Sequence, residues 1–221
     1  MIKIAYALIT SELPNDLYNE LLGKLPLSLQ EKNARFFRWQ DRHANLLGKI
    51  LLKELLMKLG YDVNCLNNLL YDRNNRPYIH TNIDFNISHS GEYVLCAIAD
   101  EGLRIGIDIE KIKTVDFNYF RNSMSFKQQE EILTSHNPIK KFFKFWTLKE
   151  SVIKADGRGL SIPLKNIYFQ DNVGCYEDKK WFLRELDIDS NYCACIATNV
   201  YCEISDIDLQ YKNIGIPLVY L

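Results

Sequence analysis

Two carboxylates lie two residues apart in the segment Ile105-Gly-Ile-Asp-Ile-Glu110. The isoleucines alternate with other residues at the period of a β-strand, so Asp108 and Glu110 are expected on one face, roughly 7 Å apart. Carboxylates this close repel each other unless a cation lies between them. Because no cysteine or histidine accompanies them, they favour magnesium or manganese over zinc. The alternative is an exposed strand face with two hydrated acids.

A second charged pair lies on a helix predicted over residues 140–154. Glu150 and Lys154 are four residues apart and Trp146 precedes Glu150 by four, so the three share one stripe of the helix. A Glu–Lys pair at this spacing often does no more than support a helix, by about 0.2–0.5 kcal/mol. The loop that follows favours a functional role, because the glycine-rich segment 157–159 suits an abrupt turn and a close approach of the backbone.

Two further groups could bind an anion. Ser88 and His89 are adjacent, which places them badly for a Ser–His nucleophile, but both can donate hydrogen bonds to an anion at a strand end. Basic residues recur at helical spacing and predict one basic helix face: Lys32, Arg35, Arg38 and Arg42. A capped turn and a solvated helix face are the alternatives. No Walker A motif or G-x-G-x-x-G is present, which argues against a P-loop ATPase and a Rossmann dehydrogenase.

The pattern along the chain predicts the elements that must position these residues. Strands are expected over 2–10, 93–99, 104–110, 168–169, 181–186 and 192–197, and helices over 13–22, 29–59 and 140–154. The strands at 93–99 and 192–197 resemble each other, and each follows a long helix at a similar distance. We interpret this as a diverged internal duplication, with chance similarity of two apolar strands as the alternative. The predicted fold is α+β, with two similar lobes at 1–102 and 103–221.

The composition argues against several classes of protein. The 221 residues include 27 Lys and Arg and 28 Asp and Glu, a balance that argues against a general nucleic-acid binder. No apolar run reaches the roughly 18 residues that span a bilayer, and the first strand is a poor signal peptide. We therefore expect a cytoplasmic protein that binds neither nucleic acid nor membrane. The six cysteines form no CxxC pair and are expected to be reduced thiols.

Taken together, these segments resemble the Sfp-type 4′-phosphopantetheinyl transferases over about residues 1–200. The motifs that carry the resemblance occur in the family's order and separation: Arg76-Pro77, Phe85-Asn-Ile-Ser-His-Ser-Gly91, Ile105-Gly-Ile-Asp-Ile-Glu-Lys111, and Phe145-Trp-Thr-Leu-Lys-Glu-Ser-Val-Ile-Lys154 followed by Gly157-Arg-Gly-Leu160. The resemblance implies a pseudo-symmetric monomer, in which each lobe is a small, mainly antiparallel sheet packed on helices and coenzyme A lies between the lobes.

The activity that the resemblance implies is the transfer of the 4′-phosphopantetheine arm of coenzyme A to a serine of an apo acyl or peptidyl carrier protein, with release of adenosine 3′,5′-bisphosphate. Asp108, Glu110 and Glu150 would bind Mg²⁺, with Mn²⁺ as a substitute. Glu150, or a water held by the metal, would accept the serine proton, and Lys154 would stabilise or protonate the departing phosphate. The residues implied to bind coenzyme A are Lys32, Asn45, Arg76, Ser88, His89 and Lys154.

Three positions depart from the family's pattern. Asn45 stands where many relatives have threonine, Arg76 where lysine is usual, and Gln128 where a glutamate often follows a Phe-Ser pair. The last departure favours Glu150 or a water as the base, although Glu130 nearby leaves the alignment open.

The resemblance also suggests where a carrier protein would dock and which other functions the same fold could have. The aromatic stretch 115–126 is a candidate docking edge for the carrier, which we expect to serve secondary-metabolite synthesis. A non-catalytic coenzyme A or nucleotide sensor on the same fold is the alternative, but the chain keeps Asp108, Glu110, Glu150 and Lys154. A metal-dependent pyrophosphohydrolase would need more carboxylates around two metals.

Overall fold

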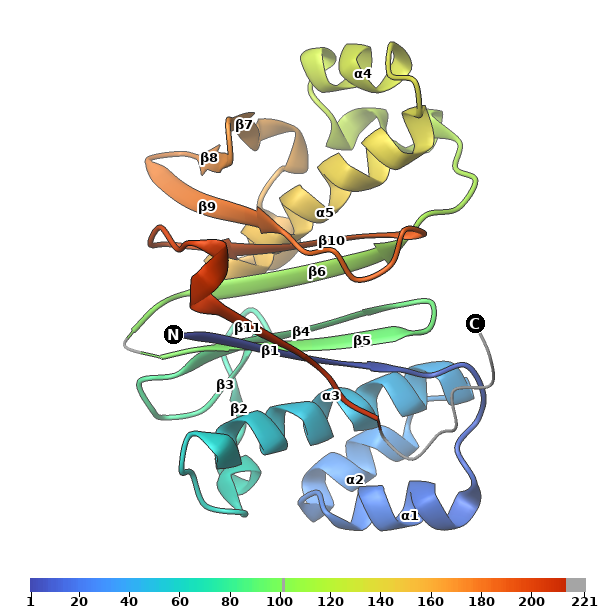
Figure 1. Ribbon diagram of the computed structural model, residues 1–221, viewed down its shortest axis with the longest axis vertical. Helices are drawn as coiled ribbons and strands as arrows, with labels where there is room; N and C mark the ends of the chain where they lie inside the picture. Colours follow the sequence, from blue (N-terminus) through green and yellow to red (C-terminus); the bar gives the residue numbers. More distant parts are fainter. Residues whose placement is uncertain (101, 214–221) are drawn as a thin grey trace.

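The computed structural model describes residues 1–100 and 102–213 as four layers, with two β-sheets face to face and helices on both outer sides (Figure 1). The first sheet has the order β11-β1-β5-β4 and the second the order β6-β10-β9-β8-β7. The strands are β1 (Ile2–Leu8), β4 (Asp84–Ser90), β5 (Tyr93–Ala99), β6 (Ile105–Lys111), β7 (Tyr168–Gln170), β8 (Val173–Tyr176), β9 (Lys179–Glu185), β10 (Tyr192–Thr198) and β11 (Ile207–Tyr211), with a small separate pair β2 (Leu70–Tyr71) and β3 (Pro77–Tyr78).

The α-helices lie below the first sheet and above the second in Figure 1. They are α1 (Asn15–Gly23), α2 (Leu27–Ala34), α3 (Trp39–Lys58), α4 (Phe126–Leu133) and α5 (Pro138–Asp156). Short 3₁₀ helices are η1 (Cys65–Asn68), η2 (Phe117–Ser123), η3 (Gly159–Ser161), η4 (Leu164–Asn166) and η5 (Ile204–Asp206). In the part of the chain that the structure describes, no helix is both long and apolar enough to cross a membrane.

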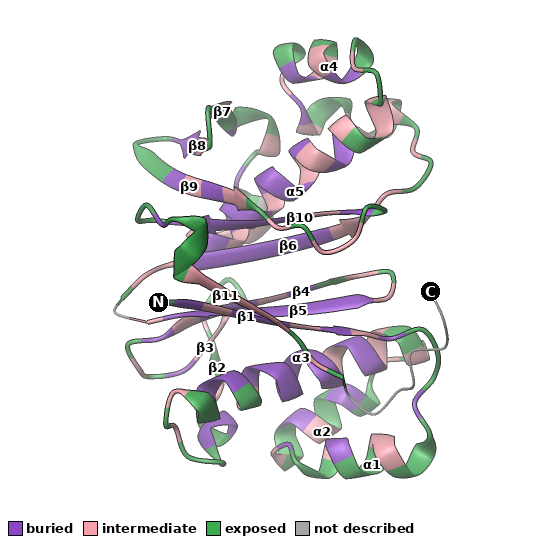
Figure 2. Ribbon diagram, viewed as in Figure 1, coloured by how far each residue is buried: buried purple, intermediate pink, exposed green. Residues whose placement is uncertain are grey.

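Strand alternation divides the interior into three apolar clusters. Along β5, alternate side chains face opposite sides of the sheet. Those that face α3 are Val94, Cys96 and Ile98, and those that face the second sheet are Tyr93, Leu95, Ala97 and Ala99. The isoleucines of β6 join that central cluster, and α5 packs over the other side of the second sheet. Buried residues accordingly run through β1, β5, β6 and β10 at the centre of the molecule (Figure 2). These strands are therefore buried on both faces, which makes them rigid supports for the site.

The predicted duplication is visible in the topology. In the first lobe, β1 is followed by α3 and then by the antiparallel pair β4–β5, whose second strand returns to pair with β1. In the second lobe, β6 is followed by α5 and by the pair β9–β10, and β10 returns to β6. The structure confirms the α+β fold and the two similar lobes.

The long helix predicted over residues 29–59 is wrong, because α2 ends at Ala34 and α3 begins at Trp39. No proline or glycine marks this break. The reason lies in the tertiary structure: fully buried Asn33 donates to the Arg42 carbonyl at 2.8 Å and to Asn45 Oδ1 at 3.0 Å. These bonds require the chain to turn between the two helices, so the four basic residues predicted on one helix face are divided between separate segments.

The second correction concerns the end of the chain. Residues 103–221 were expected in one lobe, but β11 pairs in parallel with β1 in the first sheet. Ile207 and Leu209 pack against the apolar cluster between the sheets, which explains why this segment crosses back. The boundary at residue 102 stays a prediction, and residues 214–221 lie outside the described residues.

The two sheets are joined at their edges by a ladder of side chains. Strands β4 and β6 are edge strands, and side chains of β4 accept hydrogen bonds from backbone N–H groups of β6 at a constant offset of 21 residues. The pairs are Asp84–Ile105 at 2.9 Å, Asn86–Ile107 at 3.0 Å, Ser88–Ile109 at 3.3 Å and Ser90–Lys111 at 3.1 Å. Because buried N–H groups need partners, the ladder satisfies the free edge of β6 and holds β4 in register beside it.

Arg76 closes one end of this ladder. Its guanidinium donates to both Asp84 carboxylate oxygens, at 2.9 and 2.8 Å, and to the Ile105 carbonyl at 2.9 Å. Both charged side chains are nearly buried, with 7 % and 12 % exposure. Such a pair is costly to break, because removal of one partner leaves the other charge buried and unpaired.

Asp84→Asn should therefore lower the free energy of unfolding by about 3–5 kcal/mol, as measured by urea denaturation. The control is Glu20→Gln, which breaks the exposed Lys24–Glu20 pair and should cost at most about 0.5 kcal/mol. Equal, small losses in the two variants would contradict a structural role for the Arg76–Asp84 pair.

Gly106 allows α5 to lie directly on β6. A Cβ atom at this position would come within 2.1 Å of the Ser151 carbonyl oxygen and 2.4 Å of the Ala155 nitrogen, both backbone atoms. Gly106→Ala should therefore lower the midpoint of thermal unfolding sharply, whereas Gly23→Ala, which meets no atom within 4 Å, should not. Calorimetry of the two variants checks this, and a stable Gly106→Ala protein would contradict the close packing.

Candidate functional site

Asp108 lies at the centre of the site, where β6 faces α5. Its side chain is almost fully buried, and one oxygen, Oδ1, accepts from Ser88 Oγ at 2.9 Å and from Lys154 Nζ at 2.5 Å. The other oxygen, Oδ2, is buried without a hydrogen-bond partner in the described structure. Burial raises the pKa of Asp108, although Lys154 and Ser88 oppose the rise. A buried carboxylate with one unsatisfied oxygen is well suited to accept a cation.

Glu110 follows on the same face of β6, as the alternation in the sequence predicted. Its Oε2 accepts a hydrogen bond from Ser90 Oγ at 2.8 Å. Burial raises the pKa of Glu110, and the negative charge of Asp108 raises it further. The two acids therefore act on each other electrostatically, as expected for carboxylates two residues apart on one strand.

Helix α5 supplies the other two charged groups from a well-defined segment. Asn137 caps its start by accepting from the Lys140 backbone N–H at 3.0 Å, and Gly157 ends it with a left-handed φ of 88°. Lys154 forms the ion pair with Asp108, and burial together with the charge of Asp108 raises the pKa of Glu150 to about 7. The structure therefore brings Asp108, Glu110, Glu150 and Lys154 into one electrostatic cluster.

This cluster fits a hard divalent cation in its chemistry, because its donors are carboxylate oxygens and one of them is orphaned. Among the residues that the structure describes, however, no three acids, histidines or cysteines are gathered closely enough to enclose an ion. Lys154 lies against Asp108 instead and supplies the positive charge. The assignment of Asp108, Glu110 and Glu150 as metal ligands stays a prediction.

The residues predicted to bind phosphate lie on the first lobe. Ser88 is buried and belongs to the ladder, whereas His89 is exposed on the next position of β4. Neighbouring protein atoms displace part of the water around its ring, and this desolvation, together with the charge of Lys154, lowers the pKa of His89. Lys32 is exposed at the end of α2, with its ammonium 3.8 Å from the centre of the Tyr71 ring. Asn45, on α3, accepts from Asn33 and is half-buried.

Arg76 departs from the expected geometry most clearly. It was expected to contact coenzyme A, partly through its backbone, and its guanidinium is buried and bound to Asp84 and to the Ile105 carbonyl. Its backbone N–H donates to Asp72 Oδ1 at 2.9 Å and its carbonyl accepts from the Asp72 backbone N–H at 3.0 Å. Its side chain holds the lobes together, and its contact with coenzyme A stays a prediction. No local feature of the sequence distinguishes an arginine that contacts a ligand from one that is buried in an ion pair.

Two buried lysines were not predicted. Lys149 is fully buried and donates to the Leu164 carbonyl at 2.6 Å and to the Ile167 carbonyl at 3.2 Å, so it fixes the loop that follows α5. Lys49 is buried on α3 one turn beyond Asn45, and burial lowers its pKa to about 8, with a further contribution from the charge of Lys32. The signal in the sequence is a lysine on the apolar face of each helix.

Gln128 has a structural role. Its side chain accepts from the Ser125 backbone N–H at 3.0 Å, while the Ser125 hydroxyl accepts from the Gln128 backbone N–H, which makes the capping box at the start of α4. Its amide nitrogen also donates to the Ile167 carbonyl at 3.3 Å. Its side-chain oxygen and nitrogen thereby both help to hold α4, and the identity of the base stays a prediction.

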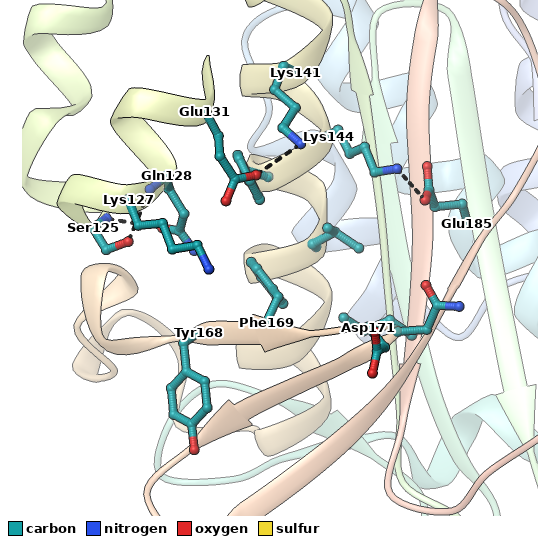
Figure 3. Close-up of a pocket in the computed structure, with 14 residues that line it drawn as sticks. Ser125, Lys127, Gln128, Glu131, Lys141, Lys144, Tyr168, Phe169, Asp171 and Glu185 are labelled. Carbon is teal, nitrogen blue, oxygen red and sulfur yellow. Dashed lines mark hydrogen bonds and ion pairs between the residues drawn. The ribbon is translucent and has the colours of Figure 1, made fainter. Parts of the chain in front are cut away.

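Gln128 also lines a pocket of about 390 Å³ between α4, α5 and the strands β7 to β9 (Figure 3). Lys141 and Lys144 project into it from α5 and are paired with Glu131 at 3.1 Å and Glu185 at 2.7 Å. The lining residues of α5, 141, 144, 145 and 148, share a face that Glu150 and Lys154 do not occupy, since successive helix residues are 100° apart. This pocket is therefore separate from the charged cluster.

The aromatic stretch 115–126 divides into packed and exposed residues. The rings of Phe117 and Phe120 pack at tilted angles against Phe142 of α5, and Met124 is buried. Tyr119 and Phe126 remain 85 % and 92 % exposed. Tyr119 and Phe126 are therefore the large side chains of this stretch that are most accessible to a docking partner.

Comparison with known proteins assigns the family. A family profile described as the 4′-phosphopantetheinyl transferase superfamily matches residues 104–197, and one described as 4′-phosphopantetheinyl transferase, N-terminal, matches residues 15–101. The chain is 34 % identical over 198 residues to 4′-phosphopantetheinyl transferase Sfp of Bacillus subtilis, covering 83 % of this chain and 77 % of that protein. It is 31 % identical to the transferase gsp of Aneurinibacillus migulanus, covering 78 % and 73 % of the two chains. The protein therefore belongs to the 4′-phosphopantetheinyl transferase family of enzymes.

Proposed function

We propose that this protein transfers the 4′-phosphopantetheine arm of coenzyme A to a serine hydroxyl of an apo acyl or peptidyl carrier protein. The observation that carries the proposal is the cluster of Asp108, Glu110, Glu150 and Lys154 between β6 and α5. One carboxylate of the cluster pairs with the ammonium group, and the other two interact electrostatically with that pair. Membership of the transferase family supports phosphopantetheine transfer as the reaction of this cluster. The basic side chains of the first lobe, such as Lys32, would bind the phosphates of coenzyme A.

Asp108, Glu110 and Glu150 would hold Mg²⁺, and Mn²⁺ could replace it. Bound there, the metal would neutralise charge on the pyrophosphate of coenzyme A. The unsatisfied Oδ2 of Asp108 and the mutual repulsion of the acids support this assignment. Lys154 would then leave Asp108 for the phosphates.

The protein's own residues would orient the reaction and move its proton. The serine oxygen attacks the phosphorus that carries the pantetheine, a new P–O bond forms, and the bond from that phosphorus to the bridging oxygen breaks. Glu150 accepts the serine proton, and Lys154 stabilises the negative charge on the departing adenosine 3′,5′-bisphosphate. Because both side chains lie one turn apart on α5, one rigid element places them.

The first lobe would bind the rest of coenzyme A. Lys32 and His89 contact phosphates, with the 3′-phosphate as their target, and Asn45 donates from α3. Ser88 and Arg76 border the nucleotide, partly through their backbone. The carrier approaches the second lobe, where exposed Tyr119 and Phe126 form an aromatic edge. The enzyme would act as a monomer.

The direct test is intact mass spectrometry of an apo peptidyl carrier protein incubated with this protein, coenzyme A and Mg²⁺. The carrier should gain the mass of one phosphopantetheine group, and a chelator should abolish the gain. Coenzyme A binding without any gain on several carriers would contradict the proposal and favour a coenzyme A sensor.

Asp108→Ala should lower turnover by about 100-fold or more, since loss of metal stabilisation removes several kcal/mol and each 1.36 kcal/mol is tenfold in rate. The same mass-spectrometric assay measures the rate, with far-ultraviolet circular dichroism as the check on folding. A folded variant with nearly normal activity would reject the metal role of Asp108.

Lys154→Ala should lower kcat much more than it weakens coenzyme A binding, because the charge that Lys154 stabilises develops on the leaving phosphate. Steady-state kinetics and calorimetric titration of coenzyme A separate the two effects. A loss confined to binding affinity would show that Lys154 acts on the bound substrate alone.

A further inference from the structure

Ser90 links the ladder between the lobes to the acidic cluster. Its hydroxyl oxygen accepts a hydrogen bond from the Lys111 backbone N–H at 3.1 Å, and the hydroxyl donates to Glu110 Oε2 at 2.8 Å. Lys111 and Glu110 are consecutive residues of β6, whereas Ser90 ends β4. The contact therefore spans the two lobes and joins a carboxylate of one to a hydroxyl of the other.

The chemistry of a hydroxyl group gives this contact a direction. A serine carries a single proton and two lone pairs, so once Lys111 N–H occupies a lone pair, the proton is directed to Glu110. The Glu110 carboxylate is held on its strand in this way, instead of sampling the rotamers open to a half-buried glutamate. Ser88 bears the same relation to Asp108, since it accepts from Ile109 N–H and donates to Asp108 Oδ1.

We propose that Ser90 is a positioning residue that fixes the Glu110 carboxylate for binding a divalent cation. The inference rests on the proposed function, in which Glu110 is a metal ligand. A hydrogen bond to a ligating carboxylate sets its orientation before the ion arrives, and loss of such a partner generally weakens metal binding about 10- to 100-fold. Ser88 is less informative as a test, because it also accepts from Lys154 at 2.9 Å.

The ladder itself supplies a matched control. Asn86 accepts from the Ile107 backbone N–H at 3.0 Å, in the same way that Ser90 accepts from Lys111, but in the described residues it donates to no carboxylate. Asn86→Ala therefore removes one rung of the ladder and leaves Glu110 with its partner. Ser90→Ala removes a rung together with the contact to Glu110.

The experiment is titration of the purified full chain with Mn²⁺ in the absence of coenzyme A, followed through the electron paramagnetic resonance signal of the free ion. Ser90→Ala should raise the Kd for Mn²⁺ by about 10-fold or more, Ser90→Thr should restore binding through its hydroxyl, and Asn86→Ala should bind as the wild type does. Thermal unfolding of each variant shows whether it is folded. If Asn86→Ala does not fold, the inference is still overturned when a folded Ser90→Ala protein binds Mn²⁺ as the wild type does.

The outcomes separate this inference from the function on which it rests. If the wild-type chain binds Mn²⁺ no better than Asp108→Asn does, the metal site itself is rejected. The proposed role of Ser90 is then rejected as well. If Asp108→Asn loses binding but Ser90→Ala keeps it, only the positioning role is overturned. Equal weakening in Ser90→Ala and Asn86→Ala would also overturn it, because the ladder and not the orientation of Glu110 would then be the cause.

Discussion

The rest of the structure depends on the meeting of two edge strands, β4 and β6, through side chains instead of backbone pairing. A free strand edge exposes N–H groups that must find partners once they are buried. Here alternate side chains of β4 provide those partners, from Asp84 to Ser90. The same contacts fix the two lobes in register, so that residues of β4 and of β6 face each other across the seam where the site lies.

This seam also explains why the charged groups remain stable inside the protein. Burial disfavours the charged forms of Asp108, Glu110 and Glu150, and it raises the pKa of each carboxyl. The ion pair with Lys154 and the hydrogen bonds from Ser88 and Ser90 offset part of that cost. The repulsion between these acids and the orphaned oxygen of Asp108 are the features on which the proposed cation site rests.

Much of the fold followed from local patterns in the sequence. The alternation over residues 105–110 placed Asp108 and Glu110 on one face, and the helical spacing placed Glu150 and Lys154 on one stripe, as the structure bears out in β6 and α5. The helix predicted over residues 29–59 was wrong because nothing local marks the break at 35–38, which depends on the bonds of buried Asn33. The last strand was placed in the wrong lobe for a similar reason, since β11 finds its partner about 200 residues earlier in the chain.

The sequence by itself determined which side chains share a face, because the periods of a strand and a helix are set by backbone geometry within a few residues. Repeated spacing of a helix and an apolar strand also indicated two similar lobes. Only the tertiary structure decided which faces meet. That Arg76 is buried on Asp84, that Lys154 lies on Asp108 and that Ser90 holds Glu110 all depend on contacts between distant segments. Such contacts are set by packing and by the need to satisfy buried polar groups, neither of which leaves a periodic signal in the chain.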